Sequence, residues 1–233
     1  MCAPLKWTTR STLETVEWTV KSTLQRIAVS EPTSTLLTAK GKRTRDRIVA
    51  AAAALMVERG VAAVSLDEVG RATSTSKSQM YHYFGSKEGL ISAVVALVGS
   101  DILRFQRGLL VDVASIDDVE RWADAIVVAQ RQGATYSGCP LGTLASELSG
   151  DVDHPQPQIE RAFVAWETLL EDGLARMVAN GVLIPGTDPH RLAVATLAAL
   201  QGGLLMAKAT QDEASLRIPL EAAVAHLRTF EAT

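Results

Sequence analysis

Apolar residues recur along this chain every three or four positions, which is the spacing of amphipathic helices. No stretch alternates apolar and polar residues as a half-buried strand does, so the sequence predicts an all-α fold. Asp188 and Pro189 give the clearest start signal, because a capping carboxylate precedes a proline at the first helical position. Asp117 is the expected cap of an earlier helix. From Asp101 onward we expect helices at about 102–110, 117–133, 141–148, 157–180, 189–209 and 219–230.

Shorter helices are expected nearer the N-terminus. One runs from about Thr44 to Gly60, and glycine suits the left-handed position that often ends a helix. A very short helix is expected after Ser65, with Leu66, Val69 and Ala72 as its apolar stripe, because Ser65 and Glu68 have the S-x-x-E spacing of a capping box.

A second short helix is expected over residues 77–84, after the hydroxyl-rich segment 73–76. Two short helices joined by a tight polar turn are the pattern of a helix-turn-helix. Ser86 is then placed to cap a further helix that reaches about Val98.

The second short helix has a composition that favours contact with DNA. Hydroxyl and amide groups can address base edges, and lysine, tyrosine and histidine can reach phosphates. An ordinary surface helix would more often carry Glu and Lys four residues apart. The alternative is a polar loop beside an aromatic core cluster. The residues concerned are Ser76, Lys77, Ser78, Gln79, Tyr81 and His82.

Charge is unevenly distributed along the chain. Residues 40–90 hold nine lysines and arginines against five acidic residues, a net charge of +4, and the rest of the chain carries −7 because the total is −3. Five of the basic residues lie within 40–47, an arm that suits phosphate or minor-groove contact, although a solvated basic tail would look the same. A basic module on an acidic body is typical of a nucleic-acid reader with a separate domain.

Residues 80–90, Met-Tyr-His-Tyr-Phe-Gly-Ser-Lys-Glu-Gly-Leu, resemble the L-Y-x-x-F-x-x-K-E-x-L signature of TetR-type transcriptional regulators. Residues 44–60 and 64–69 match that family's upstream pattern, so the resemblance covers about 40–98. Ser74 and Ser78 depart from it, since glycines are usual there, and Ser74 would require a strained or altered turn.

The resemblance implies a ligand-responsive regulator, most often a repressor, with double-stranded operator DNA, a small-molecule effector and a second copy of itself as partners. It also implies that Lys87 and the helix N-terminus beside it face a DNA phosphate. The expected DNA-binding residues are Arg43, Arg45, Ser65, Thr75, Ser76, Lys77, Ser78, Gln79, Tyr81, His82 and Lys87.

In that family the last two long helices form the homodimer, and here they would be 189–209 and 219–230. A face of small residues on the first would permit close approach of helices, either in a two-fold bundle or within one subunit. These residues are Ala195, Ala198, Ala199, Gly202 and Gly203.

Residues 138–148 resemble a segment of one subgroup, the LmrA/YxaF-like regulators, whose members respond to lipophilic or aromatic ligands. We therefore expect a small apolar or aromatic effector. For each candidate contact, plain core packing is the competing interpretation. Cys139 could also be a reactive thiol, but no nearby cation lowers its pKa, and a packed residue is favoured. The candidates are Phe105, Trp122, Tyr136, Cys139, Phe163, Trp166 and Met206.

The domain organisation predicted from the sequence has three parts. Residues 1–39 form an extension with a possible helix at 11–28 and a linker, residues 40–90 form the DNA-binding domain, and residues 91–233 form the ligand-binding and dimerisation domain. Two distant cysteines do not make a disulfide framework, and neither a secretory signal nor a bilayer-spanning stretch is expected, since the apolar run 193–207 is too short. We expect a cytoplasmic protein without membrane contact.

Two other functions compete with this interpretation. An enzyme is disfavoured because the sequence lacks a P-loop, a dinucleotide fingerprint and G-x-S-x-G. The four histidines (His82, His154, His190, His226) are not spaced as metal ligands, so neither cofactor nor metal is expected. A DNA-binding factor whose body binds a peptide or protein partner is the other alternative, and a filled core would favour it.

Overall fold

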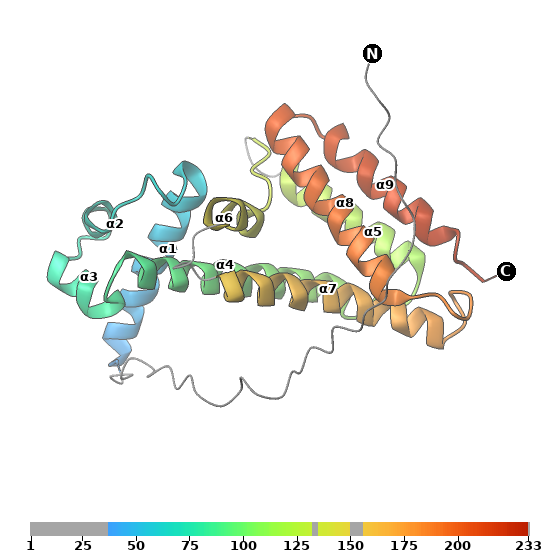
Figure 1. Cartoon of the computed structure of the whole chain (residues 1–233), viewed down its shortest axis with the longest axis horizontal. Coiled ribbons are helices and arrows are strands. Elements are labelled where there is room, and N and C mark those ends of the chain that lie inside the picture. Colours follow the sequence, from blue (N-terminus) through green and yellow to red (C-terminus); the bar gives the residue numbers. More distant parts are fainter. Residues whose placement is uncertain (1–36, 132–134, 150–155, 233) are drawn as a thin grey trace, which may run out of the picture. The chain divides into compact units, whose positions relative to one another are not determined.

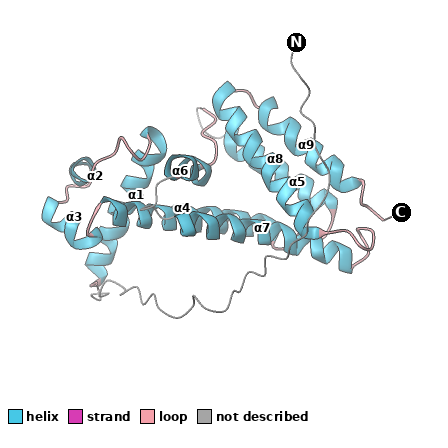
Figure 2. Ribbon diagram, viewed as in Figure 1, coloured by secondary structure: helices cyan, strands magenta, loops and turns pink. Residues whose placement is uncertain are grey.

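The computed structural model describes residues 37–131, 135–149 and 156–232. Within these ranges every regular element is a helix, apart from one isolated bridge between Leu183 and Glu231, so the predicted all-α fold is confirmed (Figure 2). The possible helix at 11–28, Gly133 and His154 lie outside the described residues.

Three helices form the N-terminal unit (Figure 1): α1 (Ala39–Arg59), α2 (Leu66–Ala72) and α3 (Lys77–Phe84). Their shared core is made of side chains that are almost fully buried, namely Ile48, Ala52, Met56, Val69 and Met80. The helix-turn-helix is thus confirmed with the predicted bounds for α3. The predicted start of α1 at Thr44 is wrong, because the helix already begins at Ala39 and Thr44 donates back to the Lys40 carbonyl. The basic segment 40–47 is therefore helical.

A long helix, α4 (Lys87–Leu110), leads from this unit into the body. We expected one helix to end near Val98 and another to begin near Ile102, but α4 is continuous. Gly99 lies inside this helix, and its missing side chain lets α4 approach α7: a β-carbon there would lie 3.1 Å from that of Ala162. Ser86 caps α4 as predicted, with its hydroxyl accepting from the Gly89 N–H.

The body contains α5 (Ile116–Arg131), α6 (Pro140–Leu148), α7 (Gln156–Ala179), α8 (Pro189–Thr210) and α9 (Ala214–Arg228). α7 packs between α4 and α8, and α9 packs against α8 and α5. Asp188 caps α8 and Pro189 starts it, as the sequence predicts.

Two helix starts differ from the prediction. Asp117 does not cap α5; Ser115 does, with its hydroxyl accepting from the Asp118 N–H, while the Asp118 carboxylate binds the Ser115 N–H in return. α9 begins before Pro219, which lies inside the helix. The helix begins at Ala214, whose N–H donates to the Asp212 carboxylate just before the helix, and the proline then removes one internal hydrogen bond.

By length and composition alone, α8 is long and apolar enough to cross a membrane. The expectation that this region is too short considered only residues 193–207 and underestimated the length of the apolar helix. Its buried face lies within the helical body and contains Leu192, Ala193, Leu197, Leu200 and Leu204. α8 is therefore placed here as a core helix.

Candidate functional site

The turn between α2 and α3 is held by threonine hydroxyls. Thr73 donates to the Val69 carbonyl at 2.8 Å, and its oxygen lies 2.9 Å from the Thr75 hydroxyl. The Thr75 N–H donates to the Gly70 carbonyl. Thr75 is consequently buried and supports the turn. Ser74 takes a φ of +50°, so the strained turn expected from the missing glycine is present.

A complete capping box begins α3. The Ser76 hydroxyl accepts from the Gln79 N–H at 3.3 Å, and the Gln79 side-chain oxygen accepts from the Ser76 N–H at 3.1 Å. Ser65 caps α2 through the Glu68 N–H, but the Glu68 carboxylate turns to Arg59 instead of completing a box. Ser65, Ser76 and the Gln79 oxygen therefore fix the backbone of the motif.

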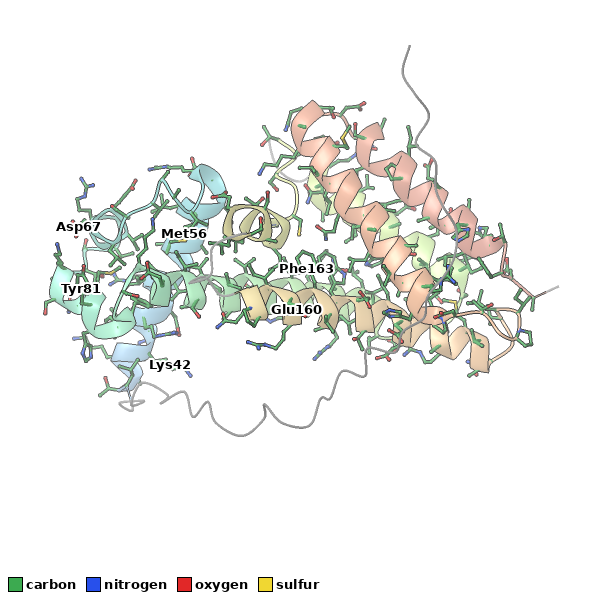
Figure 3. The ribbon with its side chains drawn as sticks, in the orientation of Figure 1. Lys42, Met56, Asp67, Tyr81, Glu160 and Phe163 are labelled. Atoms are coloured by element: carbon green, nitrogen blue, oxygen red, sulfur yellow. The ribbon has the colours of Figure 1, made fainter. Side chains whose placement is uncertain are left out.

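The outer face of α3 is polar and exposed. Met80 and Phe84 turn inward, while Lys77, Ser78, Tyr81 and His82 are exposed, with Tyr81 at 48%. Tyr81 lies on the outer side of α3 and Met56 on the inner side of α1 (Figure 3). These four side chains, with the Gln79 amide, form the presented surface of the helix-turn-helix.

The other expected DNA-binding residues are basic and lie on α1 and α4. Arg43 is exposed near the start of α1. Arg45 places its guanidinium over the ring of Phe84, 5.6 Å from its centroid, which ties α1 to the end of α3. Lys87 lies in the first turn of α4, and its ammonium donates to the Ala62 carbonyl at 3.3 Å.

A first cavity of about 280 Å³ lies between α4, α5, α7 and α8, and Phe105, Cys139 and Trp166 line it. Two buried polar atoms in its walls have no hydrogen-bond partner among the described residues: the Trp166 indole nitrogen and the Gln130 side-chain oxygen. The Gln130 amide nitrogen donates to the Gly138 carbonyl, which sets the orientation of that amide. The cavity thus offers one donor and one acceptor within apolar walls.

A second cavity of about 540 Å³ lies between α6, α7 and α8, and it shares Gly138 and Cys139 with the first. Phe163 and Leu205 contribute apolar surface to it. Its polar lining residues are Thr143, Ser146, Glu147, Gln201 and Lys208.

The remaining candidate ligand contacts line neither cavity. Trp122 is buried and donates to the Gln106 side-chain oxygen at 2.8 Å. The Tyr136 hydroxyl donates to Glu213, and Met206 is 53% exposed on α8. Cys139 caps α6, and burial raises the pKa of its thiol, which disfavours the reactive thiolate.

Two charged clusters arise from residues far apart in sequence. Arg131 and Arg217 bind Glu213, and Arg131 contributes most to lowering the pKa of that carboxyl to about 2. His190 Nδ1 lies 3.1 Å from Glu167 and 3.2 Å from Glu171, and the Glu171 hydrogen bond raises the pKa of the imidazole.

The histidine cluster could also hold a metal, since its ligand atoms lie within 4.8 Å of one another. The three side chains already contact one another, because the imidazole nitrogen lies within 3.2 Å of both carboxylates. Sequence spacing gave no sign of this cluster, since it requires α7 and α8 to be side by side.

Sequence reasoning missed Gln130, Gln201, Lys208 and Glu147 as cavity residues. No local signal distinguishes them, because a glutamine or lysine in a helix is usually a solvated residue. Only their position at the walls of the two cavities gives them a potential role.

Comparisons with known proteins identify both parts of the chain. Residues 48–94 match the family described as bacterial regulatory proteins, tetR family, and residues 115–222 match the transcriptional regulator LmrA/YxaF-like C-terminal domain. A helix-turn-helix transcriptional regulator from the lacX 3′ region of Lactococcus lactis subsp. lactis is 30% identical over 177 residues, covering 73% of this chain and 86% of that one.

The HTH-type transcriptional repressor NemR of Escherichia coli is 27% identical over 200 residues, which are 82% of this chain and 94% of that one. The structure of reduced E. coli NemR matches with a TM-score of 0.70 and 25% identity, covering 82% of this chain and 98% of that chain. A regulator from Cytophaga hutchinsonii shares the fold, with a TM-score of 0.73 at 20% identity over 84% and 99% of the two chains. Together with the helix-turn-helix and the helical body, the Lactococcus relative shows that this chain belongs to the TetR family of transcriptional regulators.

Proposed function

We propose that this chain is a cytoplasmic, homodimeric repressor that leaves its operator when a small apolar or aromatic molecule binds its body. The observation that carries the proposal is the combination, in one chain, of an exposed polar face on α3 with apolar-walled cavities in the body. The relative NemR is named a repressor, which supports the direction of the response.

The DNA-binding half of the proposal depends on α3. Lys77, Ser78 and Tyr81 project from the second helix of the motif, and such a helix enters the major groove. Its capping box fixes the first turn of the helix, which is the part that meets base edges. Arg43, His82 and Lys87 would contact phosphates on either side. Ser65, Thr75 and Ser76 would act indirectly, by holding the backbone of the motif in place.

The effector half depends on the cavities. Their volumes, about 280 and 540 Å³, suit a small molecule and favour it over a peptide or protein partner. In the first cavity, Phe105 and Trp166 would contact apolar surface of the ligand. The unpartnered Trp166 N–H would donate a hydrogen bond to the ligand, and the unpartnered Gln130 oxygen would accept one from it, so both would stabilise a ligand that offers an acceptor and a donor.

The homodimer would use the last two helices. On α8, Val194, Ala195, Ala198 and Met206 are exposed, and Ile218 of α9 is 62% exposed. An exposed apolar face of this kind is typical of an interface. Gly203 instead serves packing within one subunit, which was the alternative interpretation of the small residues on this helix. A β-carbon there would lie 3.1–3.3 Å from Leu216 of α9 in the same subunit.

Release would follow from a shift in population. A dimer presents its two α3 helices to successive major grooves, where half-sites lie about 34 Å apart. An effector that binds more tightly to a form with a different spacing lowers the fraction of dimer able to bind the operator. α4 would carry the change, since it runs without a break from Lys87 to the body.

The test is a titration of promoter DNA upstream of the protein's own gene with the purified full-length protein, followed by mobility shift. We expect a dimer to bind one palindromic site and aromatic or lipophilic compounds to release it. A protein that is monomeric, or that binds none of the upstream DNA, contradicts the proposal.

A further inference from the structure

We propose that the second cavity binds an apolar molecule carrying one acidic group, with Lys208 as its counter-ion, and that Glu147 transmits its presence to the DNA-binding unit. This inference rests on the proposed function and narrows it to a class of effector, organic carboxylates, and to one transmitting residue.

The cavity provides a cationic end. Among the described residues Lys208 has no acidic partner, and its ammonium donates only a 3.4 Å hydrogen bond to the Thr143 hydroxyl. The amide nitrogen of Gln201 is buried in the same wall, and its one acceptor among the described residues is the sulfur of Cys139, which accepts only weakly. A ligand carboxylate here would receive a charge-assisted hydrogen bond from the lysine and a second one from the amide.

The rest of the cavity is suited to the apolar part of such a molecule. Phe163 of α7 lines the cavity beside residues of α6 and α8. Leu205 is 66% exposed, and Gly202 has open space where a side chain would be. The cavity, which is open to solvent at Leu205, therefore has room for an aliphatic chain or an aromatic ring.

Glu147 belongs at once to this cavity and to the boundary with the DNA-binding unit. It lies near the end of α6 and lines the cavity, while its Oε2 accepts a hydrogen bond from the Val61 N–H at 2.5 Å. Val61 is buried in the loop between α1 and α2, and the two residues are 86 positions apart.

Gly60 makes this contact possible. Its φ is +89°, and a β-carbon at this position would lie 2.9 Å from the Glu147 carboxylate. The carbonyl of the neighbouring Ala62 accepts from Lys87 at the start of α4. The loop that leads into the helix-turn-helix is thus held by a carboxylate from α6 and an ammonium from α4.

A bound carboxylate would disturb this arrangement by charge. It would add a second negative group to a cavity that the acidic residue Glu147 lines, and like charges that share a site repel. Ligand binding and the hydrogen bond between Glu147 and Val61 therefore oppose each other. An occupied cavity favours a form of the protein in which this hydrogen bond is broken. By linkage, operator DNA must weaken ligand binding by the same factor.

The experiment measures that factor. Decanoate and naphthoate, with decanol and naphthamide as neutral analogues, are titrated by calorimetry into the full-length dimer with and without its operator. We expect the carboxylates to bind about tenfold more tightly than the neutral analogues. We also expect operator to weaken carboxylate binding about fivefold or more. In Lys208→Gln the preference for carboxylates should disappear.

Glu147→Gln distinguishes transmission of ligand binding through Glu147 from a purely structural role of its hydrogen bond to Val61. The amide still accepts from Val61 but carries no charge, so decanoate should bind at least as tightly while the operator no longer weakens its binding. Ser146→Ala, on the same helix and in the same cavity wall, should keep the wild-type factor. The inference is overturned if the neutral and the acidic probes bind equally. It is also overturned if operator DNA weakens decanoate binding to Glu147→Gln by as much as it does in the wild type. A dimer that binds operator and is released only by neutral compounds refutes this inference but leaves the proposed function intact. If the protein binds no operator, both the proposed function and the transmission through Glu147 are refuted. The comparison of Lys208→Gln with wild type then still tests whether the cavity prefers carboxylates.

Discussion

The indole N–H of Trp122 on α5 donates to the side-chain oxygen of Gln106 on α4 at 2.8 Å, and both residues are at least 97% buried, with exposures of 2% and 3%. The bond joins two helices beside the first cavity, whose wall includes Gln106. A buried amide of this kind is tolerated because its oxygen is satisfied.

Trp122→Phe should therefore destabilise the protein by more than the lost apolar area. It leaves the Gln106 oxygen without its donor, and an unsatisfied buried polar group costs about 1–3 kcal/mol. Urea unfolding followed by circular dichroism measures the change. In a double-mutant cycle with Gln106→Leu, the second substitution should recover part of the loss, and additive effects of the two changes would contradict this account.

Ser74→Gly should stabilise the helix-turn-helix. Ser74 has a φ of +50°, and a side chain in the left-handed region costs free energy that glycine avoids. We expect a gain of about 0.5–1 kcal/mol in the free energy of unfolding, seen as a higher melting temperature.

Gln211→Gly provides the matched comparison, because Gln211 also has a positive φ, of 56°. Its side chain, however, makes hydrogen bonds to the backbone of Tyr136 and Lys208. This variant should lose stability. If both substitutions stabilise the protein equally, the side-chain hydrogen bonds of Gln211 contribute nothing to the stability of the fold.

His190 should make stability depend on pH above neutrality. The hydrogen bond to Glu171 raises the pKa of the folded imidazole above its ordinary value of about 6.5. The contribution is thus complete below the unfolded pKa and is lost as the pH rises through the folded pKa. Denaturant unfolding of wild type and His190→Asn across roughly pH 5.5 to 9 measures this contribution.

The stability of His190→Asn relative to wild type should be lowest at acidic pH and should recover as the pH rises. Glu171→Gln serves as the control, since it removes the largest cause of the raised pKa and should flatten the profile. A constant difference between wild type and His190→Asn across the range would refute the assignment.

Lys77→Ala tests the presented surface of α3. Lys77 is exposed, with Asp67 only at 4.0 Å, so its charge remains available to a phosphate. Its loss should weaken operator binding and reduce the slope of log affinity against log salt concentration by about 1. Fluorescence anisotropy at several salt concentrations gives both quantities.

Arg104→Ala is the control for that measurement. Arg104 is an equally exposed cation, but it lies in the body half of α4 and pairs with Asp101 one turn away. It should change neither affinity nor slope. Equal effects of the two substitutions would mean that the DNA contact is a diffuse attraction to the whole protein rather than a surface of α3.

Local signals determined most of the helices correctly. Ser65, Ser86 and Asp188 cap the helices for which the sequence predicted them, and the cap of α3, Ser76, comes from the hydroxyl-rich segment expected before that helix. These predictions succeed because capping involves residues within one turn. The same locality explains the errors. The sequence predicted two helices, to about Val98 and from about Ile102, where α4 is continuous, and it predicted a start at Pro219 although α9 begins earlier.

For the site, the sequence alone determined the helix-turn-helix, the polar face of α3 and the presence of aromatic residues in the body. It could not tell that Thr75 is buried, that Trp122 bonds to Gln106, or that Lys208 and Glu147 line one cavity. Glu147 and Val61 are 86 residues apart, and no periodic pattern relates them. Helix formation follows from side chains within a few positions of each other, whereas cavities and contacts between units depend on how whole helices pack, which only the tertiary structure decided.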